Sequence, residues 1–403
     1  MTRDFTALDD FLADGFDGYL IDADGTDSNQ RYLSGFDAPD AFVTLYVPPD
    51  GDEDDDADER GAGVHLLVSS LEYGRARKES HATSVSRLVA YDYRDRISEH
   101  GPVDGRARTV SAFLADHGVT DVAVPADFPL GVADALREAD VGVTADETDV
   151  VTGIRATKTP DEINHVREAQ RANEAAMAAA ERLLREATVG PDDELRYEDE
   201  TLTAERVKEE IEITLLRHGC ALDETIVACG ADAADPHDRG SGPLVADEAV
   251  IVDIFPRSKA TKYHADMTRT FVKGDPSAEL QRRYEVTDEA RRAALDAVEA
   301  GVTGATVHDA VCDVYEDAGY PTLRSDPETE VGFIHSTGHG VGLDVHERPR
   351  VSPDGEELRP GHVITIEPGL YDPDVGGVRI EDLVVVTEEG HENLTAYPVE
   401  LVV

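Results

Sequence analysis

Hydrophobic positions in the first 150 residues fall into short runs, each of a length suited to one β-strand. These runs are GYLIDA (18–23), AFVTLYV (41–47), GVHLLVSS (63–70), SRLVAYDY (86–93) and DVAVPA (121–126). Apolar residues follow helical spacing instead in TVSAFLADHG (109–118) and GVADALREAD (131–140). Strands mixed with helices in this way predict a mixed α/β domain over residues 1–155.

The pattern changes near Thr157, where about thirty residues (158–187) follow helical spacing almost without interruption. Thr159 is suited to cap this helix and Pro160 to its first position. We expect further helices at 204–217, 278–299 and 306–316, and strands at 224–228, 249–255 and near the C-terminus. These elements predict a second domain over residues 156–403, and an α/β (α+β) fold for the whole chain.

Charge limits the possible partners. Asp and Glu number 86 against 37 Lys and Arg, which gives a net charge of −49. Such a field repels nucleic acid and anionic membranes, so we expect neither as a partner. Only six lysines occur, and we expect the salt-rich cytoplasm of an extreme halophile, where the Debye length shrinks to about 3 Å at 1 M. The acidic run at 50–59 lacks the glycine of a calcium loop and predicts a solvated hairpin tip.

The N-terminal residues and the cysteines indicate the cellular compartment in which the protein works. The start, MTRDFTALDDFLADGF, has acids where an export signal needs a basic and then an apolar segment. No apolar run approaches the roughly 18 residues of a membrane span. Cys220, Cys229 and Cys312 cannot all pair and form no CxxC. We expect a cytoplasmic protein with reduced thiols, and a Cys220–Cys229 disulfide stays open as the alternative.

One candidate site lies in LIDADGT (20–26), which matches a phosphatase pattern with Asp22 as nucleophile and Asp24 as acid. Such enzymes also need a lysine and an acidic pair for magnesium, and Lys78 is the only lysine in the first 150 residues. The other interpretation is a strand that ends in an acidic turn, and we prefer it.

A second candidate site combines four carboxylates with one imidazole: Asp253, Asp266, His339, Glu367 and Glu381. This ligand set suits two divalent cations that share carboxylates and a water. His339 lies in HSTGHGVGLDVHERP (335–349), and the three glycines that follow Thr337 would each cost a helix about 1 kcal/mol. We therefore expect an extended segment, in agreement with the absence of the second His of an HExxH helix.

Several stretches resemble the pita-bread metallopeptidase family, which includes Xaa-Pro aminopeptidases, prolidases and methionine aminopeptidases. They are DPH (235–237), Asp253 with HADMTRTF (264–271), HSTGHGVGLDVHE (335–347), TIEPGLY (365–371) and GVRIEDL (377–383). In addition, NQRYLSGF (29–36) is similar to the N-terminal domain of creatinase and prolidase relatives. The resemblance implies a creatinase-like domain at 1–155 and a pita-bread catalytic domain at 156–403.

The resemblance also implies the roles of the metal ligands. Asp253 would chelate one ion, Asp266 and Glu381 would bridge both, and His339 with Glu367 would complete the second site. Glu367 would also move the protons of the bridging water.

Four further residues have roles implied by the resemblance. His237 and His346 would contact the scissile amide and its oxyanion. His335 would line the substrate pocket, with a satisfied wall histidine as the alternative. Arg379 would pair with a ligand carboxylate.

The expected activity is hydrolysis of Xaa-Pro bonds in peptides with proline at the second position, by a hydroxide that bridges two metals. Mn or Co suits the oxygen-rich ligands, and Zn or Fe would be accepted. Aminopeptidase action is slightly favoured over dipeptidase action, and a homodimer is implied by the resemblance. Alternatives are an inactive pita-bread scaffold that binds peptides or a protein, and a creatinase-type hydrolase without metals. Both are disfavoured, because converging carboxylates without metals carry a desolvation cost.

Two departures from the family pattern stand out. The usual DxG at the first ligand reads Asp253-Ile-Phe, and Asp266 follows two residues later than expected for prolidases. The connection over the site is therefore expected to differ. His362 stands where the family often has Met; we expect it at an exposed or wall position and give it no role.

Overall fold

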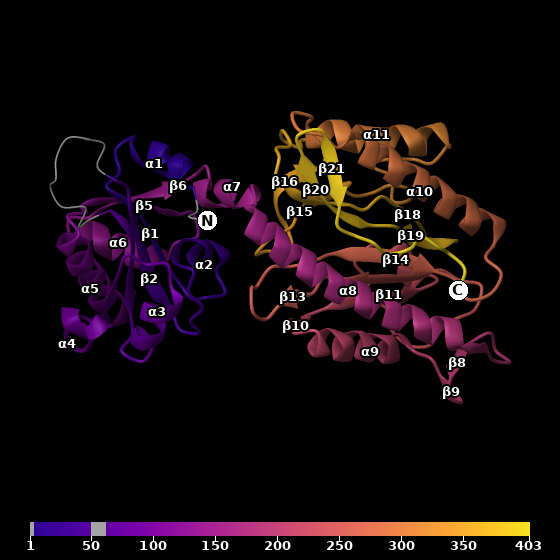
Figure 1. Ribbon diagram of the computed structural model, residues 1–403, viewed down its shortest axis with the longest axis horizontal. Helices are drawn as coiled ribbons and strands as arrows, with labels where there is room; N and C mark the ends of the chain where they lie inside the picture. The colour runs from indigo at the N-terminus through magenta and orange to yellow at the C-terminus, as the bar shows by residue number, and fades with distance from the viewer. Residues whose placement is uncertain (1–3, 50–61) are drawn as a thin grey trace. The chain divides into compact units, whose positions relative to one another are not determined.

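The computed structural model describes residues 4–49 and 62–403. The acidic run at 50–59, predicted as a hairpin tip, lies outside the described residues. Contacts divide the chain into two compact units, Thr2–Arg155 and Ala156–Val403. Figure 1 draws the first in indigo to magenta and the second in magenta to yellow.

The first unit is built on one mixed sheet of six strands in the order β4-β3-β2-β1-β5-β6. The strands are β1 (Gly18–Ala23), β2 (Phe42–Val47), β3 (Gly63–Val68), β4 (Ser84–Arg87), β5 (Asp121–Pro125) and β6 (Gly142–Asp146). Its helices are α1 (Thr6–Leu12), α2 (Ser28–Ser34), α3 (Tyr73–Glu79), α4 (Tyr93–His100), α5 (Pro102–Asp116) and α6 (Leu130–Glu138), and α7 (Val150–Ala156) leads to the second unit. Apolar residues of α5 and α6 pack on those of β1, β2, β3 and β5 to form the core.

The predicted strand SRLVAYDY is wrong beyond its second residue. β4 ends at Arg87, Leu88–Tyr91 form a 3-10 helix, and α4 begins at Tyr93. A 3-10 helix has three residues per turn, so Leu88 and Tyr91 lie on one face. Both pack against the core below α5. The apolar run therefore contributes to the core as a turn of helix. β6 was missed, because its sequence GVTAD has little apolar character.

The second unit begins with the predicted long helix, α8 (Pro160–Glu186), which is confirmed. Thr159 caps it: its side chain accepts the Glu162 N–H, and the Glu162 side chain accepts the Thr159 N–H, as in a capping box. α9 (Ala204–Arg217) follows, and both helices pack on β11 (Thr225–Cys229), β12 (Val250–Ile254) and β14 (Met267–Phe271).

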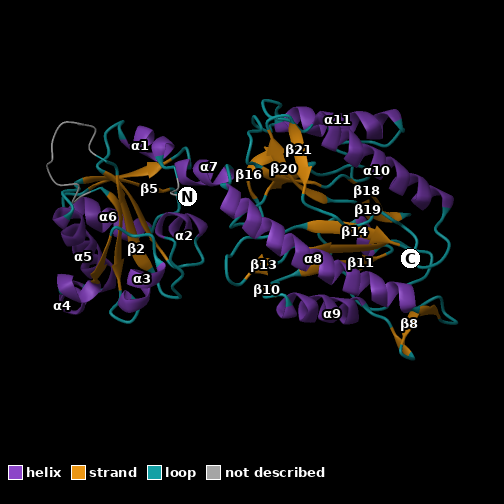
Figure 2. Cartoon of the chain, in the orientation of Figure 1, coloured by secondary structure: helices purple, strands orange, loops and turns teal. Residues whose placement is uncertain are grey.

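The other half of this unit repeats that plan with a second pair of helices. α10 (Ala278–Ala297) and α11 (Gly304–Asp317) pack on β16 (Glu347–Val351), β17 (Val363–Ile366) and β20 (Asp382–Thr387). In Figure 2 the two helix pairs lie on opposite sides of the unit, with strands between them. The remaining strands are β7 (Thr188–Val189), β8 (Leu195–Tyr197), β9 (Glu200–Thr201), β10 (Cys220–Ala221), β13 (Arg257–Ser258), β15 (Gly338–Gly340), β18 (Gly369–Asp372), β19 (Gly376–Arg379) and β21 (Gly390–Asn393).

The two principal sheets of this unit are β11-β12-β14 and β16-β15-β17-β20-β21. Cys220, Cys229 and Cys312 are all free, so the alternative Cys220–Cys229 disulfide is not formed. Among the helices of residues 4–49 and 62–403, none combines the length and the apolar character that crossing a bilayer requires.

Candidate metal centre

Strands of the second unit bring the five predicted metal ligands into one region. Asp253 lies on β12, which pairs antiparallel with β14, and Asp266 immediately precedes β14. His339 is the central residue of β15, and Glu367 directly follows β17, to which β15 is paired. Glu381 lies between β19 and β20, and its N–H donates to the Thr268 carbonyl on β14 at 3.1 Å. That bond connects the two halves of the unit at the site.

Distances show which of these side chains meet. Ligand atoms of Asp266, His339 and Glu381 all lie within 4.8 Å of one another. His339 Nε2 lies 3.3 Å from Glu367 Oε1 and 3.8 Å from Asp266 Oδ2. Asp253 Oδ1 is buried and has no hydrogen-bond partner. A buried carboxylate oxygen without a donor is costly, and a divalent cation beside these oxygens would relieve that cost. The residues therefore fit the metal ions that their chemistry implies.

Burial and crowding shift the protonation of these groups. Burial, reinforced by the neighbouring carboxylates, raises the pKa values of Asp266 and Glu381 well above their usual range. Burial likewise raises the pKa of Glu367 to about 8 and lowers the pKa of His339 to about 3. A nearby divalent cation reverses the shift of the carboxylates, because it stabilises their charged form.

The tautomer of His339 follows from its neighbours. Its Nδ1 lies 3.1 Å from the Gly340 carbonyl oxygen, which can only accept a hydrogen bond. Nδ1 therefore carries the proton, and the lone pair of Nε2 faces Glu367 and Asp266. This neutral form of the ring is the one that binds metals.

Glycine is required on both sides of His339, because the backbone of neighbouring strands leaves no room there for a Cβ atom. A Cβ at Gly338 would lie 2.0 Å from the Thr365 carbonyl oxygen, and one at Gly340 would lie 2.1 Å from that of Arg348. β15 thus runs tightly between β16 and β17. The prediction that this segment is extended is confirmed for Gly338–Gly340.

Arg379 is the centre of a buried polar group beside the site. It pairs with Asp253, with Nη2 2.7 Å from Oδ2. Its Nη1 donates to the Tyr371 hydroxyl at 2.8 Å, and its Nε donates to Thr268 Oγ1 at 3.2 Å. The expected pairing of Arg379 with a carboxylate of the ligand set is present in this arrangement.

His335 uses both ring nitrogens inside the protein. Nδ1 lies 2.7 Å from the Ser336 carbonyl, so it donates there, and Nε2 lies 3.0 Å from the Tyr371 hydroxyl. Because that hydroxyl accepts from Arg379, its proton donates to His335. This geometry favours the satisfied wall histidine over substrate contact. Tyr371 was missed in the sequence, because an aromatic residue on a buried strand looks like core.

The two other predicted histidines are exposed. The ring of His346 lies edge-on to that of His339, with centroids 4.2 Å apart. His237 follows Pro236, whose carbonyl accepts from Arg379 Nη1 at 3.3 Å. The His346 ring therefore lies beside the cluster, and both histidines have surface accessible to a substrate.

The longer spacing between Asp253 and Asp266 forms a hairpin loop that extends β12 and β14. Arg257 bridges to His264, and β13 in this loop pairs with β10. The His264 N–H donates to the Gly342 carbonyl at 2.8 Å, which attaches the loop to the glycine-rich segment. The connection between Asp253 and Asp266 thus lies beside the histidine segment.

Two other sequence candidates have structural partners. His362, expected at an exposed or wall position, is buried, and its Nδ1 accepts the Arg359 N–H at 3.1 Å. Both oxygens of Asp22 are bound by Arg106. Asp24 accepts the N–H and the hydroxyl of Thr26. These contacts favour the strand that ends in an acidic turn over the phosphatase site.

Comparison with known families agrees with this geometry. Residues 164–388, more than half of the chain, match metallopeptidase family M24. The chain belongs to this family. Its N-terminal part, residues 7–157, matches the Creatinase/Prolidase N-terminal domain. The protein therefore has a creatinase-type N-terminal domain followed by the pita-bread domain of a family of peptidases that use divalent metals.

Individual M24 relatives match nearly the whole chain. The Xaa-Pro dipeptidase of Pyrococcus furiosus is 35% identical over 361 residues, 88% of each chain. The Xaa-Pro dipeptidase of Pyrococcus horikoshii is 30% identical over 348 residues, 85% of this chain and 86% of that one. The crystal structure of the prolidase from Pyrococcus horikoshii OT3 superposes with a TM-score of 0.77 at 27% identity, covering 98% and 99% of the two chains.

Proposed function

We propose that this M24 protein is a metal-dependent exopeptidase that cleaves the Xaa-Pro bond of dipeptides. The observation that carries the proposal is the convergence of Asp266, His339 and Glu381, with Glu367 and Asp253 beside them. The names of the two Pyrococcus relatives supply the bond that is cleaved. Because both are dipeptidases and match most of the chain, we favour dipeptidase action over the aminopeptidase action that the sequence slightly favoured.

Five side chains would hold two divalent ions in this proposal. Asp253 would belong to one position, His339 and Glu367 to the other, and Asp266 and Glu381 to both. The chemistry that such ions supply is activation of a water and polarisation of the substrate carbonyl. Mn or Co suits the oxygen-rich set, and Zn or Fe is compatible with it.

Glu367 is the group we assign to proton transfer. Its Oε1 accepts the Thr365 hydroxyl at 3.2 Å and faces His339. A carboxylate at this position can take up a proton from the attacking water and return it. His237 and His346, which are both exposed, would contact the scissile amide and the developing oxyanion.

Arg379 and His335 act on other side chains in this scheme. Arg379 orients Asp253, and His335 orients the Tyr371 hydroxyl that Arg379 also binds. We therefore propose them as positioning residues and remove His335 from direct contact with substrate.

We also propose a habitat, a cellular location, a role for each domain and an assembly for this protein. The net charge of −49 supports a halophilic habitat, and free thiols support a cytoplasmic location. We propose residues 156–403 as the catalytic domain and residues 1–155 as the creatinase-like domain, with a homodimer as the working assembly. An inactive peptide-binding scaffold is the competing function, and the cost of gathering unneutralised buried carboxylates disfavours it.

The experiment that tests this proposal compares substrates and metals. Protein freed of metal by chelation is incubated in high salt with Ala-Pro and with Ala-Pro-Ala, with and without MnCl₂, and products are identified by mass spectrometry. We expect Mn-dependent cleavage of Ala-Pro. Preferential release of Ala from the tripeptide would establish the aminopeptidase instead, and inactivity with Mn, Co, Zn and Fe would favour the scaffold.

A further inference from the structure

Glu381 immediately precedes β20 and Asp382 is its first residue, and the two side chains point in opposite directions. The Glu381 carboxylate lies in the ligand cluster and accepts the Thr268 hydroxyl at 2.8 Å. The Asp382 carboxylate lies on the other face and contacts Arg269 and Arg291. Successive side chains of β14 alternate in the same way, because Thr268 reaches Glu381 and Arg269 reaches Asp382. The two segments are thus joined on both faces.

Arg269 connects β14 to the Glu381–Asp382 segment on the face away from the ligand cluster. Its side chain is 1% exposed, and all five of its N–H donors are used. Nη1 donates to the carbonyls of Glu381 at 2.5 Å and Thr268 at 2.9 Å. Nη2 donates to Asp382 Oδ1 and to the Tyr397 carbonyl, each at 2.9 Å, and Nε donates to the Pro398 carbonyl at 3.0 Å. One guanidinium therefore joins β14, the Glu381 backbone and the C-terminal segment.

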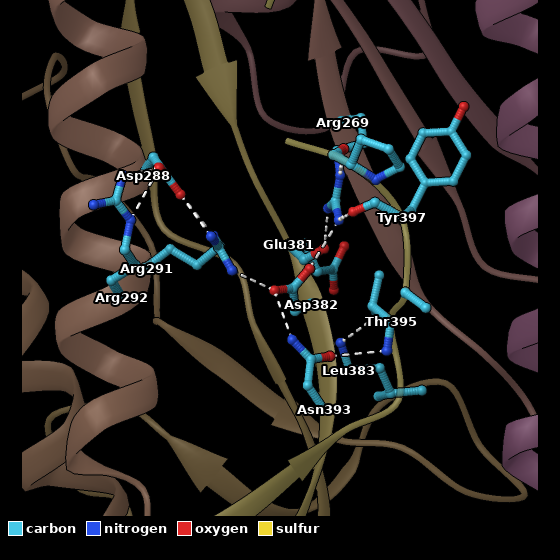
Figure 3. Close-up of polar contacts among 12 residues, drawn as sticks. Arg269, Asp288, Arg291, Arg292, Glu381, Asp382, Leu383, Asn393, Thr395 and Tyr397 are labelled. Carbon is cyan, nitrogen blue, oxygen red and sulfur yellow. Dashed lines mark hydrogen bonds and ion pairs between the residues drawn. The ribbon is translucent and has the colours of Figure 1, made fainter. Parts of the chain in front are cut away.

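Asp382 is held from two further directions. Figure 3 shows Arg291 reaching it from α10, while Arg269 approaches from the other side and Asn393 from β21. Arg291 also donates to Asp288 Oδ1 at 2.6 Å. The side chain of Asp382 is 2% exposed. A carboxylate buried to this degree needs such partners, and they leave it one orientation.

The cluster itself cannot hold Glu381 in place. Asp266, Glu367 and Glu381 are carboxylates close to one another, and like charges repel. A glutamate also has rotatable bonds through which it can leave such a site. A metal ligand must nevertheless stay within about 0.5 Å of its working position. The Glu381 backbone is instead held from outside the cluster, by its N–H on the Thr268 carbonyl and by the Arg269 guanidinium on its own carbonyl.

We propose that Arg269, Asp382 and Arg291 are positioning residues of the metal centre, which fix the Glu381 backbone so that its carboxylate faces Asp266 and His339. This assignment rests on the proposed role of Glu381 as a metal ligand. It extends the functional machinery to α10 and to the C-terminal segment, neither of which supplies a proposed ligand.

The chain offers a matched pair of variants on α10. Arg291 and Arg292 are adjacent, and both donate to Asp288, but of the two only Arg291 is paired with Asp382. Chelated wild type, Arg291→Gln and Arg292→Gln are titrated with MnCl₂ in high salt by calorimetry. We expect Arg291→Gln to lose on the order of tenfold in Mn affinity, as outer partners of metal ligands typically do. Arg292→Gln should bind Mn as wild type does.

Further measurements separate positioning from simple stabilisation. Urea unfolding of the metal-free variants reports stability alone, whereas Mn affinity and the Mn concentration for half-maximal activity report the ligand geometry. Arg269→Lys keeps the charge but loses the five-donor fork, and we expect on the order of hundredfold weaker Mn binding. If Arg269→Lys does not fold, Arg291→Gln and the nearly isosteric Asp382→Asn decide the question.

The outcomes distinguish the two proposals. Weakened Mn binding by Arg291→Gln and Asp382→Asn, with Arg292→Gln unchanged, supports positioning. Wild-type Mn affinity in both variants, accompanied only by lower stability, overturns this inference and leaves the peptidase proposal intact. Failure of the wild-type protein to bind Mn would instead overturn the proposed function.

Discussion

Replacing Lys158 by methionine would break a buried ion pair that attaches the start of α8 to the histidine segment. Lys158 Nζ donates to Glu347 Oε1, and the two side chains are 1% and 2% exposed. Nζ also donates to the Ala156 carbonyl at 3.2 Å. Methionine fills a similar volume but removes the charge, so the change isolates the electrostatic contribution.

The magnitude follows from the burial of both partners. Removing one partner of a buried pair leaves an uncompensated charge and costs about 3–5 kcal/mol in the free energy of unfolding. An exposed pair costs at most about 1 kcal/mol. We therefore expect Lys158→Met to lose about 3–5 kcal/mol, and Arg324→Gln, whose ion pairs on α11 are more exposed, to lose about 1 kcal/mol or less. Glu347 begins β16 and follows His346, so peptidase activity should fall as well.

The assay is urea unfolding followed by circular dichroism, at low and at high salt, for Lys158→Met, Glu347→Gln, the double variant and Arg324→Gln. A buried pair is poorly screened, so the Lys158→Met loss should persist at high salt, whereas the Arg324→Gln loss should shrink. The double variant should cost less than the sum of the single variants. A loss below about 1 kcal/mol for Lys158→Met, or strict additivity, would refute the reasoning.

The other predictions concern the site. Tyr371→Phe removes the hydroxyl between Arg379 and His335, and we expect kcat to fall on the order of tenfold with secondary structure unchanged; wild-type kcat would contradict the positioning role. Gly340→Ala would place a Cβ 2.1 Å from the Arg348 carbonyl oxygen, and we expect a lower melting temperature and a loss of bound Mn, measured by calorimetry and elemental analysis. In the metal-free protein the folded-state pKa of Glu367 is raised from 4.5 to about 8, and those of Asp266 and Glu381 are also raised. Their contribution to stability is therefore fully present at low pH and lost as pH rises toward 8. Buried histidines such as His339, whose pKa is lowered to about 3, act in the opposite direction up to about pH 7, so urea unfolding of chelated protein should show decreasing stability from pH 7 to pH 8. A metal-free protein that gains stability over that range would contradict these shifts.

Local signals in the sequence predicted the helices of the second unit well. Thr159, Pro160 and Glu162, all within four residues, mark the start of α8. The helix Ala204–Arg217 has the predicted bounds because its apolar spacing is regular. Leu88–Tyr91 was mispredicted, because an apolar run does not reveal whether it pairs as a strand or packs as a turn.

The candidate site was predictable where a residue belongs to a short motif. Motif residues such as His339 and Glu381 are recognisable from their neighbours in sequence. Contacts between distant segments leave no such trace: Arg269 lies 113 residues from Asp382, and Lys158 lies 189 residues from Glu347. Arginines and lysines of this kind look like surface residues until the fold shows them buried. The contacts that we propose to position the metal ligands therefore became visible only in three dimensions.

The central claim is that five side chains of the second unit hold two divalent ions. Anomalous diffraction from crystals of the protein grown with MnCl₂ tests it most directly. We expect two Mn peaks, one bound by Asp253 and one by His339 and Glu367, with Asp266 and Glu381 in contact with both. Peaks elsewhere, or no Mn among these residues at saturating MnCl₂, would contradict it.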